Sequence, residues 1–497
     1  MDDSSALCVT VDRCFRHARD PDAFARKWHA INGFLLGTSC SGTDGLAFAL
    51  LPCIRARLVV ALAALGFTES ELCAIPPRLF RSGFAVEINV VRRQFIMRAH
   101  GSELGDFRLF PDLLRLCTHD GKATDVVTGS LQSVPKARVF VSGTSCRNFS
   151  NLCNASRKVT SVQVATSSVG KASGSISTLE AALAYIKKYR PAIVVFENVL
   201  AIGCSRHDAV SVLDCTLAAL RQLGYMTCFA HIDAHKLDGA QSRLRCWYGG
   251  VLVETVDTER ALRFESDVSD AVRHFGLGSS DTRSAVDAYF EPDDCELVHR
   301  ALLRMATGSN GGRPDAWVDQ HAAYELSFVE ADNSIGGHAI SYSDRTDTLR
   351  SPGVACLPLR EQDLVRLKAL EMGDRIGWCL IPTDKSLSWC KPFDINKLPC
   401  LTQKSRLFSW RRRRCILGFE QFKVQMGVHS RADVAKHFGI GVEHEFDDEF
   451  FRKAAGDAFS LCSACAFLCA VVDSLTHDEV VSLARVQDSL LQASLQD

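Results

Sequence analysis

The feature that most constrains the fold is an alternation of short apolar runs with longer helical patterns in the first half of the chain. Strand-length apolar runs occupy residues 33–36, 84–88, 138–142, 192–196, 226–232 and 247–253, and helical patterns occupy 46–65, 178–189 and 209–223. This alternation is typical of βαβ units, which build a parallel sheet covered by helices. We therefore predict an α/β fold with a Rossmann-like, doubly wound sheet and ligand sites at the strand carboxyl ends.

The alternation fades after residue 255, which divides the chain into parts. Residues 1–30 are predicted to form a short helical preface, and residues 31–255 the sheet domain. Residues 256–395 mix charges, glycine-rich turns and short apolar pieces without a clear period, which indicates a smaller, loop-rich domain. Residues 396–497 are predicted to form a mainly helical C-terminal segment.

The composition is that of an ordinary globular protein. The 497 residues are 47% hydrophobic and 23% charged, with a net charge of −1. We expect no membrane span, because no uninterrupted apolar run reaches the roughly 18 residues that a spanning helix needs. The 21 cysteines are an odd number with irregular spacing, which favours a reducing, intracellular compartment over a disulfide scaffold. Cys462, Cys465 and Cys469 share a helical period with apolar neighbours, so we expect core packing there and no metal site.

Positive charge is concentrated in one segment. Residues 385–414 hold nine Lys or Arg against one Asp, interleaved with Trp389, Phe408 and Trp410. Such a stripe is typical of a phosphate-contacting surface. The alternative is a solvated face that nearby acidic residues neutralise.

Three candidate ligand-binding groups follow the first strands. A glycine loop (Gly37-Thr-Ser-Cys40-Ser-Gly42-Thr-Asp44-Gly45) precedes a helix, where glycines and unpaired N–H groups let a ligand approach the backbone. Glu87 ends the next strand, where an acidic side chain typically binds ribose hydroxyls; an exposed strand-end Glu is about as common. Asp112 is a weaker candidate for binding an adenine amino group, because Pro-Asp also marks turns.

Three further candidates carry chemistry. Cys146 follows a strand in a polar, turn-prone loop, although a cysteine is more often a small core residue. Glu197 ends a buried strand, where burial is expected to raise the pKa of the carboxyl and suit it to proton donation. Arg243 and Arg245, in Gln241-Ser-Arg-Leu-Arg, share one face of the last strand and need an acidic or anionic partner.

This order of motifs resembles that of the cytosine-C5 DNA methyltransferases: a glycine loop, a strand-end Glu, a loop Cys, Glu-Asn-Val and Gln-x-Arg-x-Arg. Two C-terminal segments extend the resemblance. Residues 398–422 are similar to the penultimate motif of the family, and Gly456-Asp457-Ala458-Phe459 to the segment that closes the cofactor pocket. Residues 256–395 stand where the family carries its target-recognition domain, and residues 396–497 where a segment completes the catalytic domain.

The resemblance implies S-adenosylmethionine as cofactor and a flipped cytosine as substrate. The implied nucleophile is Cys146, with Glu197 as proton donor and Arg243 and Arg245 as catalytic arginines. The implied cofactor-binding residues are Cys40, Gly42, Asp44, Gly45, Glu87, Asp112 and Asp457. The implied substrate-binding residues are Asn198, Gln241, Arg411 and Arg413. Double-stranded DNA is the expected partner and tRNA the alternative, for a monomer in the nucleus, or in the cytoplasm or nucleoid of a non-eukaryotic cell.

The chain departs from the family at four places. Thr144-Ser145 replaces Pro-Pro before the cysteine, which removes two residues with fixed φ. Cys40 and Asp44 replace an aromatic residue and a glycine, the gap from Asp44 to Glu87 is about twice the usual length, and Asp457 replaces Asn. Because the chemical groups remain, we expect an active enzyme; a nucleic-acid-binding relative with little catalysis and a methyltransferase for small molecules are the alternatives.

Overall fold

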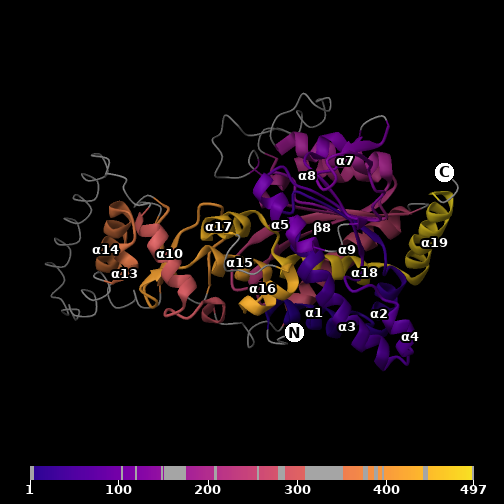
Figure 1. Cartoon of the computed structure of the whole chain (residues 1–497). Helices are drawn as coiled ribbons and strands as arrows, with labels where there is room; N and C mark the ends of the chain where they lie inside the picture. Colours follow the sequence, from indigo (N-terminus) through magenta and orange to yellow (C-terminus); the bar gives the residue numbers. More distant parts are fainter. Residues whose placement is uncertain are drawn as a thin grey trace.

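We describe the protein from a computed structural model of the whole chain (Figure 1). The structure describes residues 5–101, 105–117, 120–146, 149, 175–205, 210–253, 257–277, 286–307, 351–372, 379–385, 390–394, 397–439 and 446–494. Trp389, in the basic segment, lies outside these residues.

A seven-stranded sheet forms the centre of the molecule, in the order β3-β2-β1-β6-β7-β9-β8. Its strands are β1 (Leu35–Ser39), β2 (Arg81–Val86), β3 (Arg108–Phe110), β6 (Val139–Ser142), β7 (Ile193–Asn198), β8 (Tyr225–Asp233) and β9 (Leu244–Leu252). Strands β3, β2, β1, β6 and β7 pair in parallel, and β9 pairs antiparallel with both β7 and β8. The predicted α/β fold with a mostly parallel sheet is confirmed.

Two details of the sheet differ from the prediction. Strand β3 was missed, because three residues carry too little periodicity to mark a strand. Strand β9 runs against its neighbours, whereas a parallel arrangement was expected. Only residues 234–243 join β8 to β9, with the short 3-10 helix η6 (Ala234–Leu237) among them. A parallel crossover needs a dozen or more residues, so this link permits only an antiparallel return.

Helices cover both faces of the sheet. The helices of the first 101 residues and of the middle segment are α1 (Ala6–His17), α2 (Pro21–Ala30), η1 (Leu46–Leu50), α3 (Leu51–Ala64), α4 (Glu69–Cys73), α5 (Val90–His100), η3 (Leu113–Cys117), α7 (Ser175–Tyr189), η5 (Leu200–Gly203), α8 (Val212–Gln222) and α9 (Thr258–Gly276). Those of the C-terminal part are α15 (Gly418–Met426), α16 (Arg431–Phe438), α17 (Asp448–Asp457), α18 (Leu461–Ser474) and α19 (His477–Ser494). Figure 1 shows α7 and α8 on one side of the sheet and α9, α18 and the N-terminal helices on the other.

Strand alternation assigns side chains to two separate cores. On β6, Val139 and Val141 join the core that contains α1, α3 and α18, whereas Phe140 joins the core that contains α7 and α8. On β7, Val195 and Val194 divide in the same way. This period of two is what a sheet buried on both faces requires.

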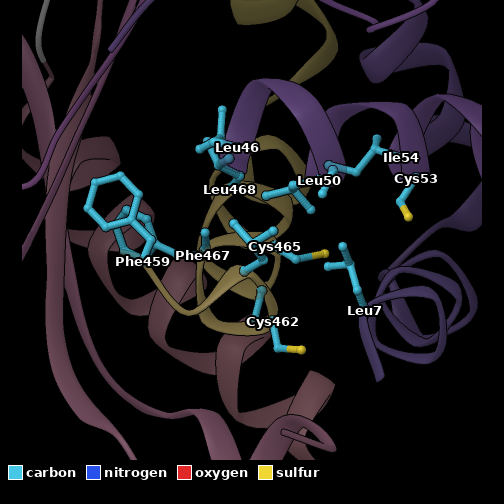
Figure 2. Packing of buried hydrophobic residues seen from close by; sticks show 14 of the residues in the cluster. Leu7, Leu46, Leu50, Cys53, Ile54, Phe459, Cys462, Cys465, Phe467 and Leu468 are labelled. Carbon is cyan, nitrogen blue, oxygen red and sulfur yellow. The ribbon is translucent and has the colours of Figure 1, made fainter. Parts of the chain in front are cut away.

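Helix α18 is buried along its whole length, as is α15. Every residue from Leu461 to Ser474 is buried, and Figure 2 shows Cys462 and Cys465 of α18 near Leu7 of α1 and Cys53 of α3. Two helical stretches, Leu46–Ala64 and Asp448–Ser474, are apolar and long enough to cross a membrane, although no such stretch was expected. Their most apolar windows are 56% and 89% buried inside the protein, as in the core helices of globular proteins.

A second sheet lies in the part that follows α9. Its strands, in the order β11-β10-β12-β13, are β10 (Cys379–Pro382), β11 (Phe393–Asp394), β12 (Leu407–Ser409) and β13 (Arg414–Cys415). Helices α10 (Glu296–Thr307), α13 (Pro352–Ala355) and α14 (Leu359–Met372) belong to the same region, at one end of the molecule in Figure 1. The predicted boundary between residues 395 and 396 falls inside this sheet, because β12, from the far side of it, pairs with β10, and β13 pairs with β12.

Candidate active site

The topology brings Cys146 and Glu197 to one edge of the central sheet. Ser142, the last residue of β6, pairs with Phe196 on the parallel strand β7, so the loop after β6 and Glu197 leave the sheet together. Strand β9 runs the other way and delivers Arg245 to this edge. The Arg245 Nε atom lies 3.1 Å from the Glu197 Oε1 atom, and both side chains are largely buried.

Cys146 is open to solvent on one side, yet protein surrounds the rest of its side chain. Loss of water around the sulfur raises the pKa of the thiol above its ordinary value, and the negative charge of Glu197 raises it further. Arg245 and Arg243 act in the opposite direction and do not outweigh these two effects. The thiol of the free site is therefore poorly ionised at neutral pH.

Hydrogen bonds hold the loop that carries Cys146. The buried Asn198 side chain donates from Nδ2 to the Thr144 carbonyl oxygen at 3.2 Å and to the Thr144 hydroxyl at 2.9 Å. The backbone N–H of Ser145 donates to the Thr178 hydroxyl at 3.1 Å. Asn198 was predicted to bind the substrate, but its amide is committed to this loop.

Arg243 has a positioning role. Its guanidinium is buried and donates to the carbonyl oxygens of Leu401 at 3.1 Å and Ala458 at 3.2 Å, and its distance to Glu197 is 3.9 Å. It therefore ties β9 to two C-terminal segments. Gln241 does the same, since its amide donates to Gln425, whose own amide donates to the Ala458 carbonyl at 2.6 Å.

One further member of this group, Cys400, was not predicted from the sequence. Its sulfur accepts a hydrogen bond from Arg245 Nη2 at 3.2 Å and lies 4.0 Å from Arg243 Nη1. Although burial acts to raise it, the two guanidinium groups lower the pKa of the Cys400 thiol below its ordinary value. Cys400 stands in the segment that resembles the penultimate motif, and only the fold brings it to the arginines.

The glycine loop after β1 packs against the segment that follows α17. A Cβ atom on Gly42, whose φ is +78°, would lie 3.3 Å from the Ala458 nitrogen. A Cβ atom on Gly143 would lie 2.6 Å from the Cys40 carbonyl oxygen and 2.7 Å from the Phe459 ring. Glycine is therefore required at both positions, and the expected return of the C-terminal segment to the glycine loop is present.

Asp44 does not face a ligand. Its carboxylate is buried, accepts a hydrogen bond from the Thr38 hydroxyl at 2.8 Å and lies 3.4 Å from His100 Nε2. The His100 ring stacks on Phe107 at a centroid distance of 3.5 Å. The predicted role of Asp44 in cofactor binding therefore does not fit this geometry; the side chain holds the loop, with its own φ at +55°.

The carboxyl ends of β2 and β3 place two acidic groups near the glycine loop. Glu87 is buried and accepts from the Asn89 N–H at 2.8 Å, and burial raises the pKa of its carboxyl. Asp112 directly precedes η3, and its carboxylate accepts a hydrogen bond from the Leu114 N–H at 3.0 Å. Both groups keep one carboxylate oxygen without a hydrogen bond among the described residues, as hydroxyl or amino recognition requires.

Asp457 forms an ion pair near the glycine loop. Arg92 at the start of α5 pairs with Asp457, and Gln403 donates to both of its carboxylate oxygens at 2.6 Å. Arg92 also acts electrostatically on Glu87. At Cys40, burial raises the pKa of the thiol to about 12, so this side chain is a neutral wall of the loop.

Several cations of the basic segment, residues 385–414, form ion pairs with acidic side chains of the protein. Arg411 pairs with Asp287 at 2.7 Å, and Arg414 is buried against Glu420 at 2.9 Å. Arg406 and Arg412 also form ion pairs, with acidic residues outside the segment. Arg413 is exposed and forms no ion pair among the described residues. Five of the nine cations form ion pairs among the described residues, whereas Lys391, Lys397, Lys404 and Arg413 form none, so the acidic alternative fits about half of the predicted phosphate-contacting stripe.

A cavity of about 680 Å³ lies between α5, α10 and α17. Asn89 and Arg92 line one side, and Arg300 and Arg304 line another. Cys146, Glu197 and Arg245 do not line it, so it is separate from the edge of the sheet where the reactive groups meet.

Comparison with known proteins agrees with this arrangement. Residues 119–291 match the model of the C-5 cytosine-specific DNA methylase family. No curated protein sequence matches the chain. Among solved structures, the fold is similar to Dnmt2 methyltransferase of S. pombe (11% identity, 88% of this chain and 98% of that one, TM-score 0.44). It is also similar to an Entamoeba histolytica methyltransferase (9% identity, 90% and 99%, TM-score 0.43).

The matched region contains Cys146, Glu197 and Arg245, which the structure brings to one edge of the sheet. Enzymes of this family take their methyl group from S-adenosylmethionine. The matched region, residues 119–291, is accordingly that of a C-5 cytosine-specific methylase, an S-adenosylmethionine-dependent methyltransferase.

Proposed function

We propose that the protein methylates carbon C5 of cytosine in double-stranded DNA through a covalent bond to Cys146. The observation that carries this proposal is the convergence of Cys146, Glu197 and Arg245 at the carboxyl edge of adjacent strands. A methyltransferase for small molecules has no need of this trio, because cytosine C5 becomes nucleophilic only after attack at C6.

The residues around the glycine loop fit S-adenosylmethionine. Gly42 and Gly143 keep the backbone clear of side chains, and Glu87 and Asp112 offer carboxylate oxygens at the ends of β2 and β3. When bound, S-adenosylmethionine supplies the methyl group that C5 of the base takes. The replacement of an aromatic wall by Cys40 makes this pocket less apolar than the family pattern.

Each step assigns a task to a residue of this chain. The Cys146 thiolate forms a bond from sulfur to C6 of the flipped base, and electrons move toward N3. Glu197 holds a proton at N3, and Arg245 holds the Glu197 carboxyl in place. After C5 is methylated, a base removes its proton, and the electron pair left behind expels the Cys146 thiolate.

Duplex DNA is proposed over tRNA because the region between β9 and the C-terminal segment is long, as a duplex-recognising domain requires. The protein should transfer tritium from methyl-labelled S-adenosylmethionine to duplex DNA. Transfer to tRNA alone would overturn the choice of substrate, and transfer to neither would overturn the enzyme.

The covalent step has its own test. A duplex with 5-fluorocytosine should form a denaturant-stable adduct with the wild type and with Cys204→Ser, an exposed cysteine in another loop. Cys146→Ser should form no adduct. Methyl transfer that survives Cys146→Ser would contradict the covalent mechanism. We further propose a nuclear location, or the nucleoid in a cell without a nucleus, from the DNA substrate alone.

A further inference from the structure

Three buried thiols from two distant parts of the chain meet between α1 and α18. Cys14 lies on α1, and Cys465 and Cys469 lie one turn apart on α18. Their sulfur atoms all lie within 4.8 Å of one another, and none of the three side chains is exposed. The chain places Cys14 some 450 residues before the other two, so no sequence spacing could indicate this cluster.

The spacing of the sulfurs fits a metal ion. Zinc–thiolate bonds are about 2.3 Å long, so two sulfurs on one ion are separated by about 3.8 Å in tetrahedral and about 4.0 Å in trigonal geometry. Cys465 and Cys469 have their sulfurs 4.0 Å apart. Figure 2 shows the Cys465 thiol on the side of α18 that faces Leu7 of α1, the helix that carries Cys14. An ion at the centre would draw the three sulfurs together by a few tenths of an ångström.

The surroundings suit a soft metal ion and not a hard one. The cluster has only thiol ligands among the described residues, and thiolates select Zn²⁺ or Cu⁺ over Mg²⁺ or Ca²⁺. Three thiolates leave net negative charge on either ion. Arg13, which is 5% exposed, acts electrostatically on Cys14, and its Nη1 atom has no hydrogen-bond partner among the described residues. The same guanidinium forms a buried ion pair with Asp238 at 2.5 Å, so it offsets only part of the charge at the cluster, and Asp473 acts on Cys14 in the opposite direction.

We propose that Cys14, Cys465 and Cys469 bind one soft d¹⁰ metal ion, Zn²⁺ or Cu⁺, in a closed structural site. The ion joins α1 to α18. Helix α18 directly follows the Ala458-Phe459 segment that packs on Gly42 and Gly143, so the site fixes the base of the cofactor pocket. Because the thiols are fully buried, the ion enters during folding and does not exchange from a finished surface site.

Metal content tests the proposal without reference to activity. The full-length protein, produced under reducing conditions in medium with added Zn²⁺ or with added Cu⁺ and then dialysed, should retain about one equivalent of one of these ions by mass spectrometry. Cys14→Ala and Cys465→Ala should lose it. Cys228→Ala is the matched control, because Cys228 is equally buried on β8 outside the cluster and should leave metal content unchanged.

A second measurement needs no variant that has to fold. Production with Cd²⁺ should give the ultraviolet charge-transfer band of cadmium–thiolate bonds. A strong chelator that removes the ion should lower the midpoint of thermal unfolding. Wild-type protein that retains no metal under any of these conditions would overturn the proposal and leave the thiols as core packing, and metal retained by Cys14→Ala would overturn this ligand set.

Discussion

Removal of the Asn198 amide tests whether hydrogen bonds hold the Cys146 loop in the place of proline. Asn198 is fully buried, and Asn198→Ala deletes both bonds to Thr144, so the Thr144 carbonyl oxygen loses its donor among the described residues, whereas the Thr144 hydroxyl keeps its contact with Tyr248. A buried hydrogen bond contributes about 1 kcal/mol, and an orphaned buried acceptor costs about 1–3 kcal/mol. Misplacement of a reacting group by about 1 Å lowers a rate by about 100-fold. We therefore expect the rate of adduct formation with 5-fluorocytosine DNA to fall by about 10–100-fold.

A double-mutant cycle separates this cause from a general loss of packing. Thr144→Val removes one of the two acceptors and should lower the rate by about tenfold, a barrier increase of about 1.4 kcal/mol. The double variant should be no more than about threefold slower than Asn198→Ala, because that bond is already lost. Thr216→Val is the control, since it deletes a buried hydroxyl on α8 that bonds to its own helix, and it should leave the rate unchanged. Additive effects of the two site substitutions would refute the reasoning.

Three further outcomes follow from the structure. Arg414→Leu removes the cation from the buried carboxylate of Glu420, which accepts two hydrogen bonds from Arg414 at 2.9 and 3.0 Å, so chemical denaturation should show a loss of about 3–5 kcal/mol; unchanged stability would contradict a structural role for this ion pair. Gly42→Ala meets Ala458 at 3.3 Å and a φ of +78°, so calorimetry should show weaker S-adenosylmethionine binding, whereas wild-type affinity would contradict the packing of this loop. Burial and Glu197 raise the pKa of Cys146, so its thiolate fraction grows as pH rises, and adduct formation should increase by about tenfold per pH unit from about pH 6 to about pH 8; a flat profile would show that the thiol is already ionised.

The central sheet was predictable because local patterns specify it. Buried strands β6 and β7 give continuous apolar runs, and the helical patterns between strands match α3, α7 and α8. The direction of β9 was not predicted from its own residues, since it depends on the length of the link from β8. Strand β3 and the short strands of the second sheet carry too few residues for a periodic signal.

The sequence predicted which residues form the site better than it predicted the contacts that each of them makes. Chain order pointed to Cys146, Glu197 and Arg245, because groups at the ends of adjacent strands must meet. It gave no indication that Asp44 turns inward to Thr38 or that Arg411 pairs with Asp287. Those partners lie on other elements, and in the second case 124 residues away. Long-range pairing of charges is decided by the tertiary structure and leaves no local pattern.

The distribution of charge at the sheet edge explains why the pKa of the Cys146 thiol is raised when no substrate is bound. Arg245 divides its guanidinium between Glu197 at 3.1 Å and Cys400 at 3.2 Å. The two arginines lower the pKa of the Cys400 thiol below its ordinary value, whereas at Cys146 they offset only part of the effects of burial and Glu197, and the pKa stays raised. Under the proposed mechanism, ionisation of Cys146 accompanies substrate binding, when a base that enters the site displaces water and Glu197 turns from an ion-pair partner of Arg245 into a proton carrier for N3. Such coupling confines the reactive thiolate to the moment at which a cytosine is present.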